Sequence, residues 1–147
     1  MIYNNLITLL IGIPGSGKST WAKEFIKNNP NYIRINRDSY RLMMQYSQFL
    51  DYRGEKLITE MVNSDIDLAL KAGYNIILDQ TNCKAKYLNE FVNKYKDIVN
   101  IEFKVFDIDV NTAIKRDKNR EAMVGEEVIR RIYSDYCNLI KIFDFNQ

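Results

Sequence analysis

Histidine is absent from this chain of 147 residues, and cysteine is scarce. The absence of histidine excludes Ser-His-Asp and Cys-His nucleophilic catalysis and every metal site that depends on a histidine ligand. A general base must therefore be a carboxylate, a lysine, a tyrosine or a cysteine. The two cysteines, Cys83 and Cys137, form no Cys-x-x-Cys motif. We therefore expect free, partly buried thiols and neither a disulfide framework nor a zinc site.

Long apolar runs and linkers are also missing. The longest apolar run, residues 6–13, is interrupted by Thr8 and Gly12 and is far shorter than a membrane span. The first residues lack the basic region of a signal peptide, so we expect a cytoplasmic protein (in the host cytoplasm if viral) without membrane association. The chain has only two prolines and six glycines, and its length predicts one domain over residues 1–147.

The net charge of +2 is too small for a protein that coats nucleic acid by charge alone, although it allows a local basic groove. Hydrophobic residues make up 46% and charged residues 27% of the chain, which is typical of a globular protein.

A phosphate-binding pattern follows the first apolar run. Residues 12–20, Gly-Ile-Pro-Gly-Ser-Gly-Lys-Ser-Thr, match G-x-x-x-x-G-K-[ST] between a predicted strand and a predicted helix. The glycines let the backbone present N–H groups to phosphate oxygens, and the start of the helix adds positive potential. We expect Lys18 to neutralise the β- and γ-phosphate oxygens and Ser19 to ligate Mg²⁺. The expected nucleotide-binding residues of this loop are Gly12, Pro14, Gly15, Ser16, Gly17, Lys18, Ser19 and Thr20.

We expect the nucleotide to be ATP. The Asn-Lys-x-Asp motif that reads guanine is missing, because the nearest candidate, residues 93–96, lacks the aspartate. A glycine-rich turn that binds nothing is the alternative, but both the pattern and its context favour nucleotide binding.

Strand-like apolar runs alternate with amphipathic, helix-like runs. The expected strands are residues 6–11, 32–35, 75–78 and 101–106. The expected helices are residues 19–27, 38–48, 55–72, 84–96 and 112–118, followed by an apolar stripe from Val128 to Phe143. Leu57 belongs to the face of the long helix that is expected to point inward, and Ile140 belongs to the apolar stripe. The alternation predicts an α/β three-layer sandwich of the P-loop NTPase type, with a central parallel sheet of about four strands, helices on both faces and a short lid.

An acidic residue, Asp38, follows the second predicted strand. Because ligands of open parallel sheets bind beyond the carboxyl ends of the strands, Asp38 should face the phosphates. Its task there would be to act as the general base for a hydroxyl acceptor or to hold Mg²⁺ through water. The alternative is a helix N-cap. Arg41, one turn later, could grip an acceptor phosphate or be an exposed helical arginine.

The third predicted strand also ends at an acid, Asp79. In P-loop enzymes an acid at this place orders Mg²⁺ through water or orders a catalytic arginine. The alternative is turn chemistry before the next helix, and both interpretations remain open for Thr81 and Asn82.

A basic segment with Arg116 and Arg120 precedes Gly125. Such a segment can close over ATP, with an arginine touching the transferring phosphoryl group. The alternative is a solvated, charged helix face.

Asp107 and Asp109 resemble the paired aspartates that begin a haloacid-dehalogenase phosphatase. Too few residues follow for that domain, so we interpret them as a strand end and a helix cap.

These motifs resemble the kinase half of the phage 5′-hydroxyl polynucleotide kinase/3′-phosphatase family, in order and over nearly the whole chain. The matching segments are residues 12–20 with Trp21, Ile35-Asn36-Arg37-Asp38-x-Tyr40-Arg41, Asp79-x-Thr81-Asn82, Lys104-Val105-Phe106-Asp107 and Lys115-Arg116-x-x-x-Arg120.

The resemblance implies an enzyme that uses ATP and Mg²⁺ to phosphorylate the 5′-hydroxyl ends of DNA or RNA during repair, working alongside a nucleic-acid ligase or a separate phosphatase. It implies that Lys18 and Ser19, with Thr20, hold the β-phosphate and Mg²⁺. It makes Asp38 the general base on the 5′-hydroxyl, and Arg41 the ligand of the 3′-phosphate of the acceptor nucleotide.

The resemblance also implies that Asp79 orders the site, and that Arg120 stabilises the transition state from the lid with support from Arg116. Two positions depart from the family: Ser39 replaces a second acid, and the acid before Thr-Asn can lie one position later, where this chain has Gln80. The phosphatase half is missing from residues 1–147, so we expect no removal of 3′-phosphates.

Two other functions remain open. The same aspartate base would serve a P-loop kinase of a small hydroxyl substrate, such as a nucleoside, a sugar or an antibiotic. A nucleotide-dependent switch without an acceptor would bind ATP and hydrolyse it slowly, but it leaves Asp38 and Arg120 without a task.

Overall fold

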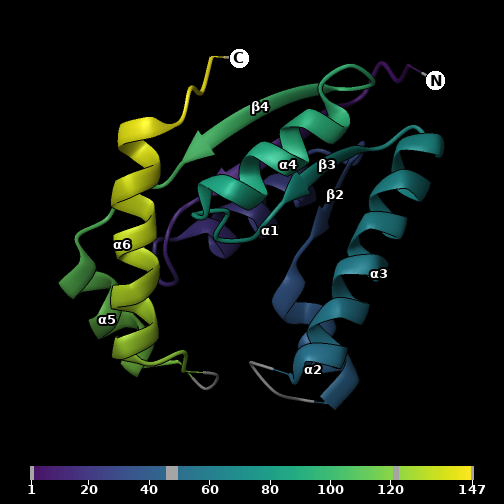
Figure 1. Cartoon of the computed structure of the whole chain (residues 1–147). Helices are drawn as coiled ribbons and strands as arrows, with labels where there is room; N and C mark the ends of the chain where they lie inside the picture. Colours follow the sequence, from purple (N-terminus) through teal and green to yellow (C-terminus); the bar gives the residue numbers. More distant parts are fainter. Residues whose placement is uncertain (1, 46–49, 121–122, 147) are drawn as a thin grey trace.

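The computed structural model describes residues 2–45, 50–120 and 123–146 (Figure 1). Among these residues, four strands form one parallel sheet in the order β2-β3-β1-β4. The strands are β1 (Leu6–Ile11), β2 (Tyr32–Ile35), β3 (Asn75–Leu78) and β4 (Asn100–Val105). The predicted α/β fold with a parallel sheet is confirmed. The central strand β1 is buried on both faces, which is why it reads as a continuous apolar run.

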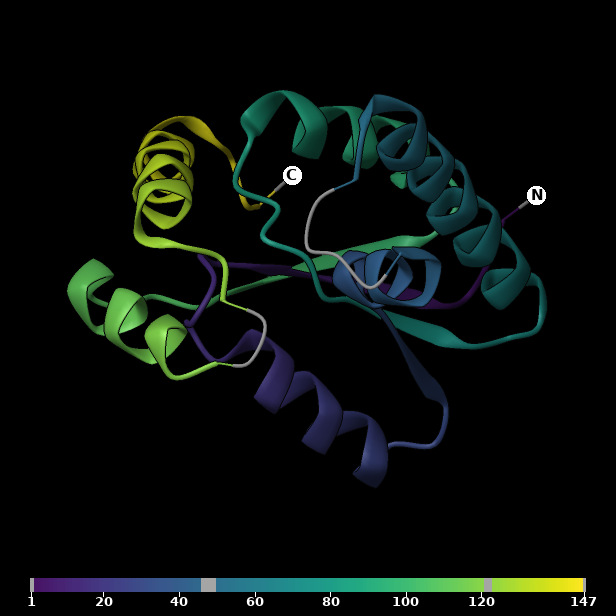
Figure 2. The same cartoon turned by 90° about the horizontal axis from the view of Figure 1, so that it is seen from below.

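Six helices of the described residues surround the sheet. They are α1 (Lys18–Asn28), α2 (Arg37–Gln45), α3 (Tyr52–Lys71), α4 (Ala85–Tyr95), α5 (Val110–Lys118) and α6 (Glu126–Ile142). Helix α1 lies on one side of the sheet, and α3, α4 and α6 lie on the other (Figure 2). No helix among the described residues has the length and apolar character needed to cross a membrane.

Each face of the sheet has its own hydrophobic core. The larger core joins Ile7, Leu9 and Ile11 of β1 to the buried faces of α3, α4 and α6. The smaller core joins Leu10 and Ile77 to Ala22 of α1 and is bordered by aromatic rings. Alternate residues of β1 therefore face different layers, as the pleat of a strand requires.

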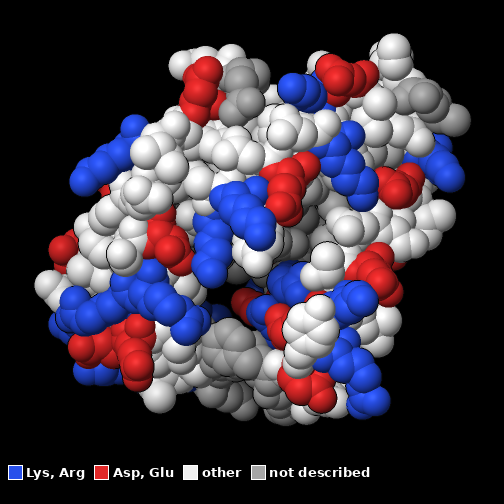
Figure 3. All heavy atoms as spheres, in the orientation of Figure 1, with Lys and Arg blue, Asp and Glu red and all other residues white. Residues whose placement is uncertain are grey.

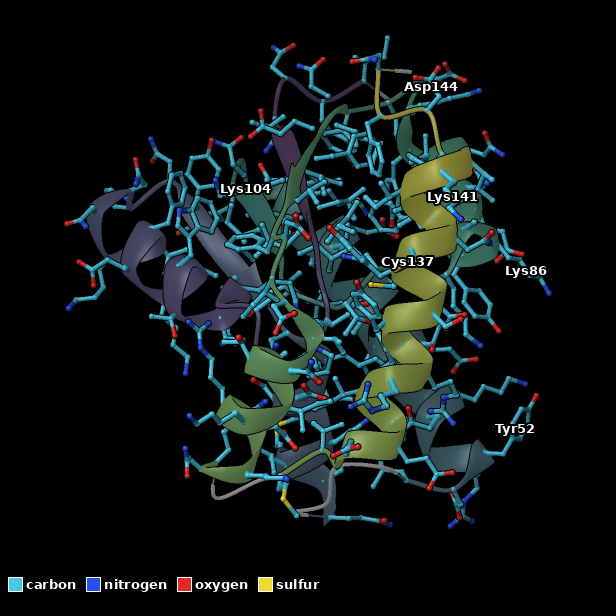
Figure 4. The ribbon with its side chains drawn as sticks, turned by 90° about the vertical axis from the view of Figure 1, so that its left-hand side faces the viewer. Tyr52, Lys86, Lys104, Cys137, Lys141 and Asp144 are labelled. Atoms are coloured by element: carbon cyan, nitrogen blue, oxygen red, sulfur yellow. The ribbon has the colours of Figure 1, made fainter. Side chains whose placement is uncertain are left out.

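At the edge of the smaller core, a lysine side chain lies against one of two stacked aromatic rings. The rings of Trp21 and Phe25 stack with centroids 4.9 Å apart, and the Lys104 ammonium lies 4.8 Å from the Trp21 ring. Figure 4 shows Lys104 between β4 and α1. Lys104 and Trp21 therefore connect the edge strand to the helix that follows the P-loop.

Two details differ from the sequence-based expectations. The expected start of the long helix at residue 55 is wrong, because Asp51 caps α3 by accepting from the Gly54 N–H at 2.8 Å. The expected inward position of Leu57 is also wrong, since this side chain is 45% exposed, and Ile140 of the apolar stripe is 43% exposed. Each lies at the edge of the apolar stripe of its helix, beside a residue that faces the sheet. Residues 46–48 of the expected second helix lie outside the described residues.

Candidate active site

A cavity of about 500 Å³ opens at the carboxyl ends of the central strands, where ligands of such sheets bind. Figure 3 shows a hollow near the centre of the molecule, with basic and acidic side chains on its rim. The lining residues are Pro14, Gly15, Gly17, Lys18, Ser19, Thr20, Lys23, Asn36, Asp38, Asp79, Gln80, Thr81, Arg116, Arg120 and Val124. Of the site residues predicted from sequence, Gly12, Ser16 and Arg41 do not line this cavity.

The loop between β1 and α1 depends on two glycines with positive φ. Gly15 has φ 84° and Gly17 has φ 97°, values that favour glycine over every other residue. A Cβ atom on Gly15 would lie only 2.8 Å from the carbonyl oxygen of Ala113 in α5. The loop therefore packs against α5 and leads directly into the N-terminus of α1, an arrangement that favours anions.

Lys18 is the first residue of α1 and is 7% exposed. Its ammonium group donates hydrogen bonds to the carbonyl oxygens of Gly12 (2.7 Å) and Ile13 (2.9 Å). Burial lowers the pKa of Lys18 to about 8, although the negative charges of Asp79 and Asp38 act in the opposite direction. A cation at the wall of a partly desolvated cavity attracts phosphate more strongly than one in water.

Asp79 follows β3 and is 1% exposed. Its Oδ2 atom accepts a hydrogen bond from Nε of Arg34 at 2.7 Å, whereas Oδ1 has no partner in the described structure. A buried acceptor without a donor costs about 1–3 kcal/mol, so this position suits water or a hydrated cation. The turn interpretation of the Asp79 side chain is wrong, because its carboxylate faces Arg34. Asn82 has a structural role, since its amide donates to the carbonyl oxygen of Leu10 at 2.6 Å.

The residues around Asp79 are suited to Mg²⁺. This ion takes one or two protein oxygens and completes its coordination with phosphate oxygens and water. The Ser19 hydroxyl and Asp79 line the same cavity, and Asp79 Oδ1 lacks a partner there. In the described ranges no group of three or more His, Cys, Asp or Glu residues could hold a metal by itself. An ion here would therefore depend on a bound nucleotide for further ligands.

Asp38 lies in the first turn of α2, with its side chain 63% exposed at the cavity. The N-cap alternative for Asp38 is wrong, because Asn36 performs that role. The Asn36 Oδ1 atom accepts from the backbone N–H of Ser39 at 2.9 Å. The Asp38 carboxylate therefore remains available to the cavity, and it accepts from Nη1 of Arg41 at 2.6 Å.

Arg41 contacts the site residue Asp38 on one side and Glu55 of α3 on the other. Its Nε and Nη2 atoms donate to Glu55 at 2.9 and 2.6 Å. The side chain is 13% exposed, so the alternative of an exposed helical arginine is wrong. Glu55 also accepts from the backbone N–H of Leu50 at 3.1 Å, and its pKa is lowered to about 2, mainly by the hydrogen bond from Arg41. Glu55 thus holds α2 and the start of α3 together.

Replacing Glu55 with glutamine should lower the free energy of unfolding at pH 7 by about 1–3 kcal/mol, because charged hydrogen bonds to Arg41 are lost. A carboxylate whose pKa is lowered by folding stabilises the protein above its ordinary pKa, near 4.5, and this stabilisation is lost as pH falls towards about 2. Urea unfolding at pH 7 and pH 3 should therefore show a smaller difference between wild type and E55Q at pH 3. A difference that does not change with pH would contradict this role.

Helix α5 packs against the P-loop, and Arg120 and Val124 beyond it line the cavity. Arg116 donates from Nη1 to the carbonyl oxygen of Gly15 at 3.2 Å, and Arg120 lines the cavity with 45% of its side chain exposed. Asp117 is 1% exposed and accepts from the N–H groups of Val124 (2.9 Å) and Gly125 (2.8 Å). Asp117 thereby holds both ends of this predicted lid together. The buried carboxylate of Asp117 shows that this basic segment is more than a solvated, charged helix face.

The interpretation of Asp109 as a helix cap is confirmed, and Asp107 lies two residues beyond the end of β4. Asp109 caps α5 by accepting from the N–H of Thr112 at 3.0 Å, and Asp107 accepts from the Tyr136 hydroxyl at 3.2 Å. Cys83 and Cys137 are free thiols. Figure 4 shows the Cys137 sulfur on the inner side of α6.

The sequence does not predict several residues of this region as members of the site. Lys23, Asn36 and Val124 line the cavity, and Arg34, Glu55 and Asp117 hold its residues in place. A charged residue within a short apolar strand, such as Arg34, is one signal that was available, because buried charges need partners. Asp117 carries a similar signal, since it lies on the inner face of α5 with Ala113 and Ile114.

The parallel α/β sheet, the P-loop and the carboxylates beside it define a P-loop kinase. Residues 7–137 match the family model described as AAA domain (AAA_33), so the chain belongs to this family.

Two curated relatives match most of this chain. A protein of Autographa californica nuclear polyhedrosis virus, provisionally named bifunctional polynucleotide kinase/RNA ligase, is 29% identical over 90% of this chain and 21% of its own length. The L-seryl-tRNA(Sec) kinase of Methanococcus maripaludis is 28% identical over 89% of this chain and 52% of its own length. The chain thus spans about half or less of the length of these relatives.

Solved structures extend the comparison. A chain in the Pnkp1/Rnl/Hen1 RNA repair complex superimposes with a TM-score of 0.88 and 34% identity, covering 99% of this chain and 48% of that chain. A deoxyadenosine kinase from M. mycoides with bound dATP has a TM-score of 0.60 at 20% identity, covering 92% of this chain and 84% of that chain, and shares the fold.

Proposed function

We propose that this protein transfers the γ-phosphate of ATP to the 5′-hydroxyl end of a polynucleotide. The observation that carries the proposal is the placement of Asp38, whose exposed carboxylate faces the same cavity as the P-loop and Lys18. A kinase with a phosphate acceptor needs no base, whereas a hydroxyl acceptor must lose a proton during transfer. Asp38 is a suitable base for that proton.

In the proposed reaction, the oxygen of the 5′-hydroxyl bonds to the γ-phosphorus, and Asp38 accepts the proton that this hydroxyl loses. The bond between that phosphorus and the bridging oxygen of ADP breaks, so the products are a 5′-phosphate end and ADP. Lys18 stabilises negative charge on the β- and γ-phosphate oxygens. Arg120 would do so from the lid, with Arg116 holding the lid to Gly15.

Ser19 and Asp79 are the proposed ligands of Mg²⁺, directly and through water respectively. When bound, this ion neutralises phosphate charge. Asp79 lines the cavity, Arg34 holds its Oδ2, and its Oδ1 has no partner in the described structure.

Arg41 has two proposed tasks. Its contact with Asp38 orients the base, and a guanidinium next to the base is proposed as the ligand of a 3′-phosphate of the acceptor nucleotide, because guanidinium groups recognise phosphate. Such a contact would favour a nucleotide over a plain sugar as the acceptor.

The polynucleotide acceptor is supported by the comparisons, since one relative and one solved complex carry names linked to polynucleotide kinase or RNA repair. The solved complex also makes Rnl and Hen1 the kind of partners to test with this protein.

The direct test is transfer of label from γ-labelled ATP to 5′-hydroxyl DNA, 5′-hydroxyl RNA, a nucleoside 3′-monophosphate and a plain nucleoside. We expect transfer to the first three and little to the nucleoside. Transfer to the nucleoside alone would favour the kinase of a small hydroxyl substrate, and ATP hydrolysis unaffected by every acceptor would favour the switch.

ATP binding should also take up a proton near pH 8. The pKa of free Lys18 is about 8, and triphosphate oxygens would raise it because they favour the ammonium form. ATP affinity should therefore fall as pH rises above about 8, where unbound Lys18 is mostly neutral. Calorimetry at about pH 8.5 in two buffers of different ionisation enthalpy measures the proton uptake. The K18M variant should show none.

A further inference from the structure

Three consecutive residues at the end of β2 hold Asp79 at three different points. The Arg34 guanidinium donates to Oδ2 at 2.7 Å, and the carbonyl oxygen of Ile35 accepts the Asp79 N–H at 2.8 Å. The Asn36 amide donates to the carbonyl oxygen of Asp79 at 2.9 Å. Side chain and backbone of Asp79 are therefore both fixed from the neighbouring strand.

The contact with Arg34 engages one carboxylate oxygen of Asp79 and leaves the other, Oδ1, without a partner in the described structure, while Asp79 lines the cavity. The Asp79 side chain is 1% exposed and that of Arg34 is 16% exposed, so water competes little for their ion pair. With Oδ2 engaged, rotation of the carboxylate is restricted, and Oδ1 remains as the oxygen without a partner in the described structure. A free carboxylate would rotate between several positions, only some of which direct an oxygen to the cavity.

We propose that Arg34 is a positioning residue for the Mg²⁺–nucleotide site: its guanidinium holds Asp79 so that Oδ1 can accept from metal-bound water. This inference rests on the proposed use of ATP and Mg²⁺, and does not depend on the identity of the acceptor. Arg34 does not line the cavity, so it acts through Asp79.

Asn36 extends this arrangement to the acceptor side of the cavity. While its amide holds Asp79, its Oδ1 caps α2 by accepting from the Ser39 N–H at 2.9 Å. The helix that it caps carries Asp38. The end of β2 therefore connects the residue proposed for metal-bound water to the residue proposed as the base.

The test measures binding of a non-hydrolysable ATP analogue, AMP-PNP, by calorimetry over a series of Mg²⁺ concentrations. No acceptor is present, so a failure of the polynucleotide proposal does not affect the result. We expect R34M to raise the Mg²⁺ concentration for half-maximal tight binding by about 10- to 100-fold, as is usual when a residue that orients a metal ligand is lost. R34K, which keeps the charge, should restore part of this loss.

A double-mutant cycle separates positioning from a general structural effect. If Arg34 acts through Asp79, R34M should cause no further shift in a D79N background. An equal shift in both backgrounds would overturn the proposal, and so would an unchanged Mg²⁺ dependence in R34M. Circular dichroism verifies folding, and R34Q, which keeps donors and most of the volume, replaces R34M if that variant unfolds.

Discussion

Replacing Lys18 with alanine should reduce phosphoryl transfer by more than about 10²-fold, corresponding to ~3 kcal/mol or more of lost transition-state stabilisation. The ammonium is already held at the cavity wall by the carbonyl oxygens of Gly12 and Ile13, so little reorganisation is needed when charge develops on the phosphate oxygens. The measurement is kcat for labelled ATP with a 5′-hydroxyl oligonucleotide.

The loss should not result from unfolding. Burial lowers the pKa of Lys18, which means that the folded protein disfavours the charged form that is present at pH 7. Removing the amine should therefore leave the melting temperature close to that of wild type. Lys27→Ala is a matched control on the same helix, because Lys27 is 74% exposed and pairs with Glu24 at 3.9 Å. Wild-type kcat in Lys18→Ala would remove the P-loop lysine from the mechanism.

The fold was largely predictable because each strand and helix is marked by a pattern of neighbouring residues in the sequence. Each strand is a short apolar run, and the observed strands begin and end within one residue of the expected positions. The errors also have local causes. The start of α3 was missed because Asp51 caps it ahead of the apolar stripe, and Leu57 was misplaced because it borders the buried face of α3.

The candidate site was predictable only where a motif is continuous in sequence. The P-loop and Asp38 belong to such motifs. The pairs that hold them do not: Arg34 contacts Asp79 across 45 positions, and Arg41 contacts Glu55 across 14. These contacts depend on the strand order and on the packing of α2 against α3, neither of which follows from residue spacing.

Asp38 could be interpreted in two ways from sequence, because the sequence does not show which residue caps α2 and which faces the cavity. An aspartate at the start of a helix is equally suited to capping and to catalysis. The structure separates these tasks, because Asn36 caps α2 and Asp38 faces the cavity. A substitution of Asp38 therefore tests chemistry with little disturbance of the helix.

Asp38→Ala should lower kcat by roughly 10²–10⁴-fold while leaving the affinity for ATP nearly unchanged, because the general base is lost and the P-loop is intact. D38N, which keeps the shape but cannot accept the proton, should be as slow as Asp38→Ala. Asp97→Asn, at an exposed position outside the cavity, serves as the control for removal of one negative charge.

The split between kcat and the KM of the acceptor decides the role of Asp38. A base contributes in the transition state, so its loss should appear in kcat. If Asp38 only orients Arg41, its loss should instead raise the KM of acceptors that carry a 3′-phosphate and leave their kcat nearly unchanged. That second pattern would exclude the general-base assignment and make Arg41, held by Glu55, the residue through which the acceptor is recognised.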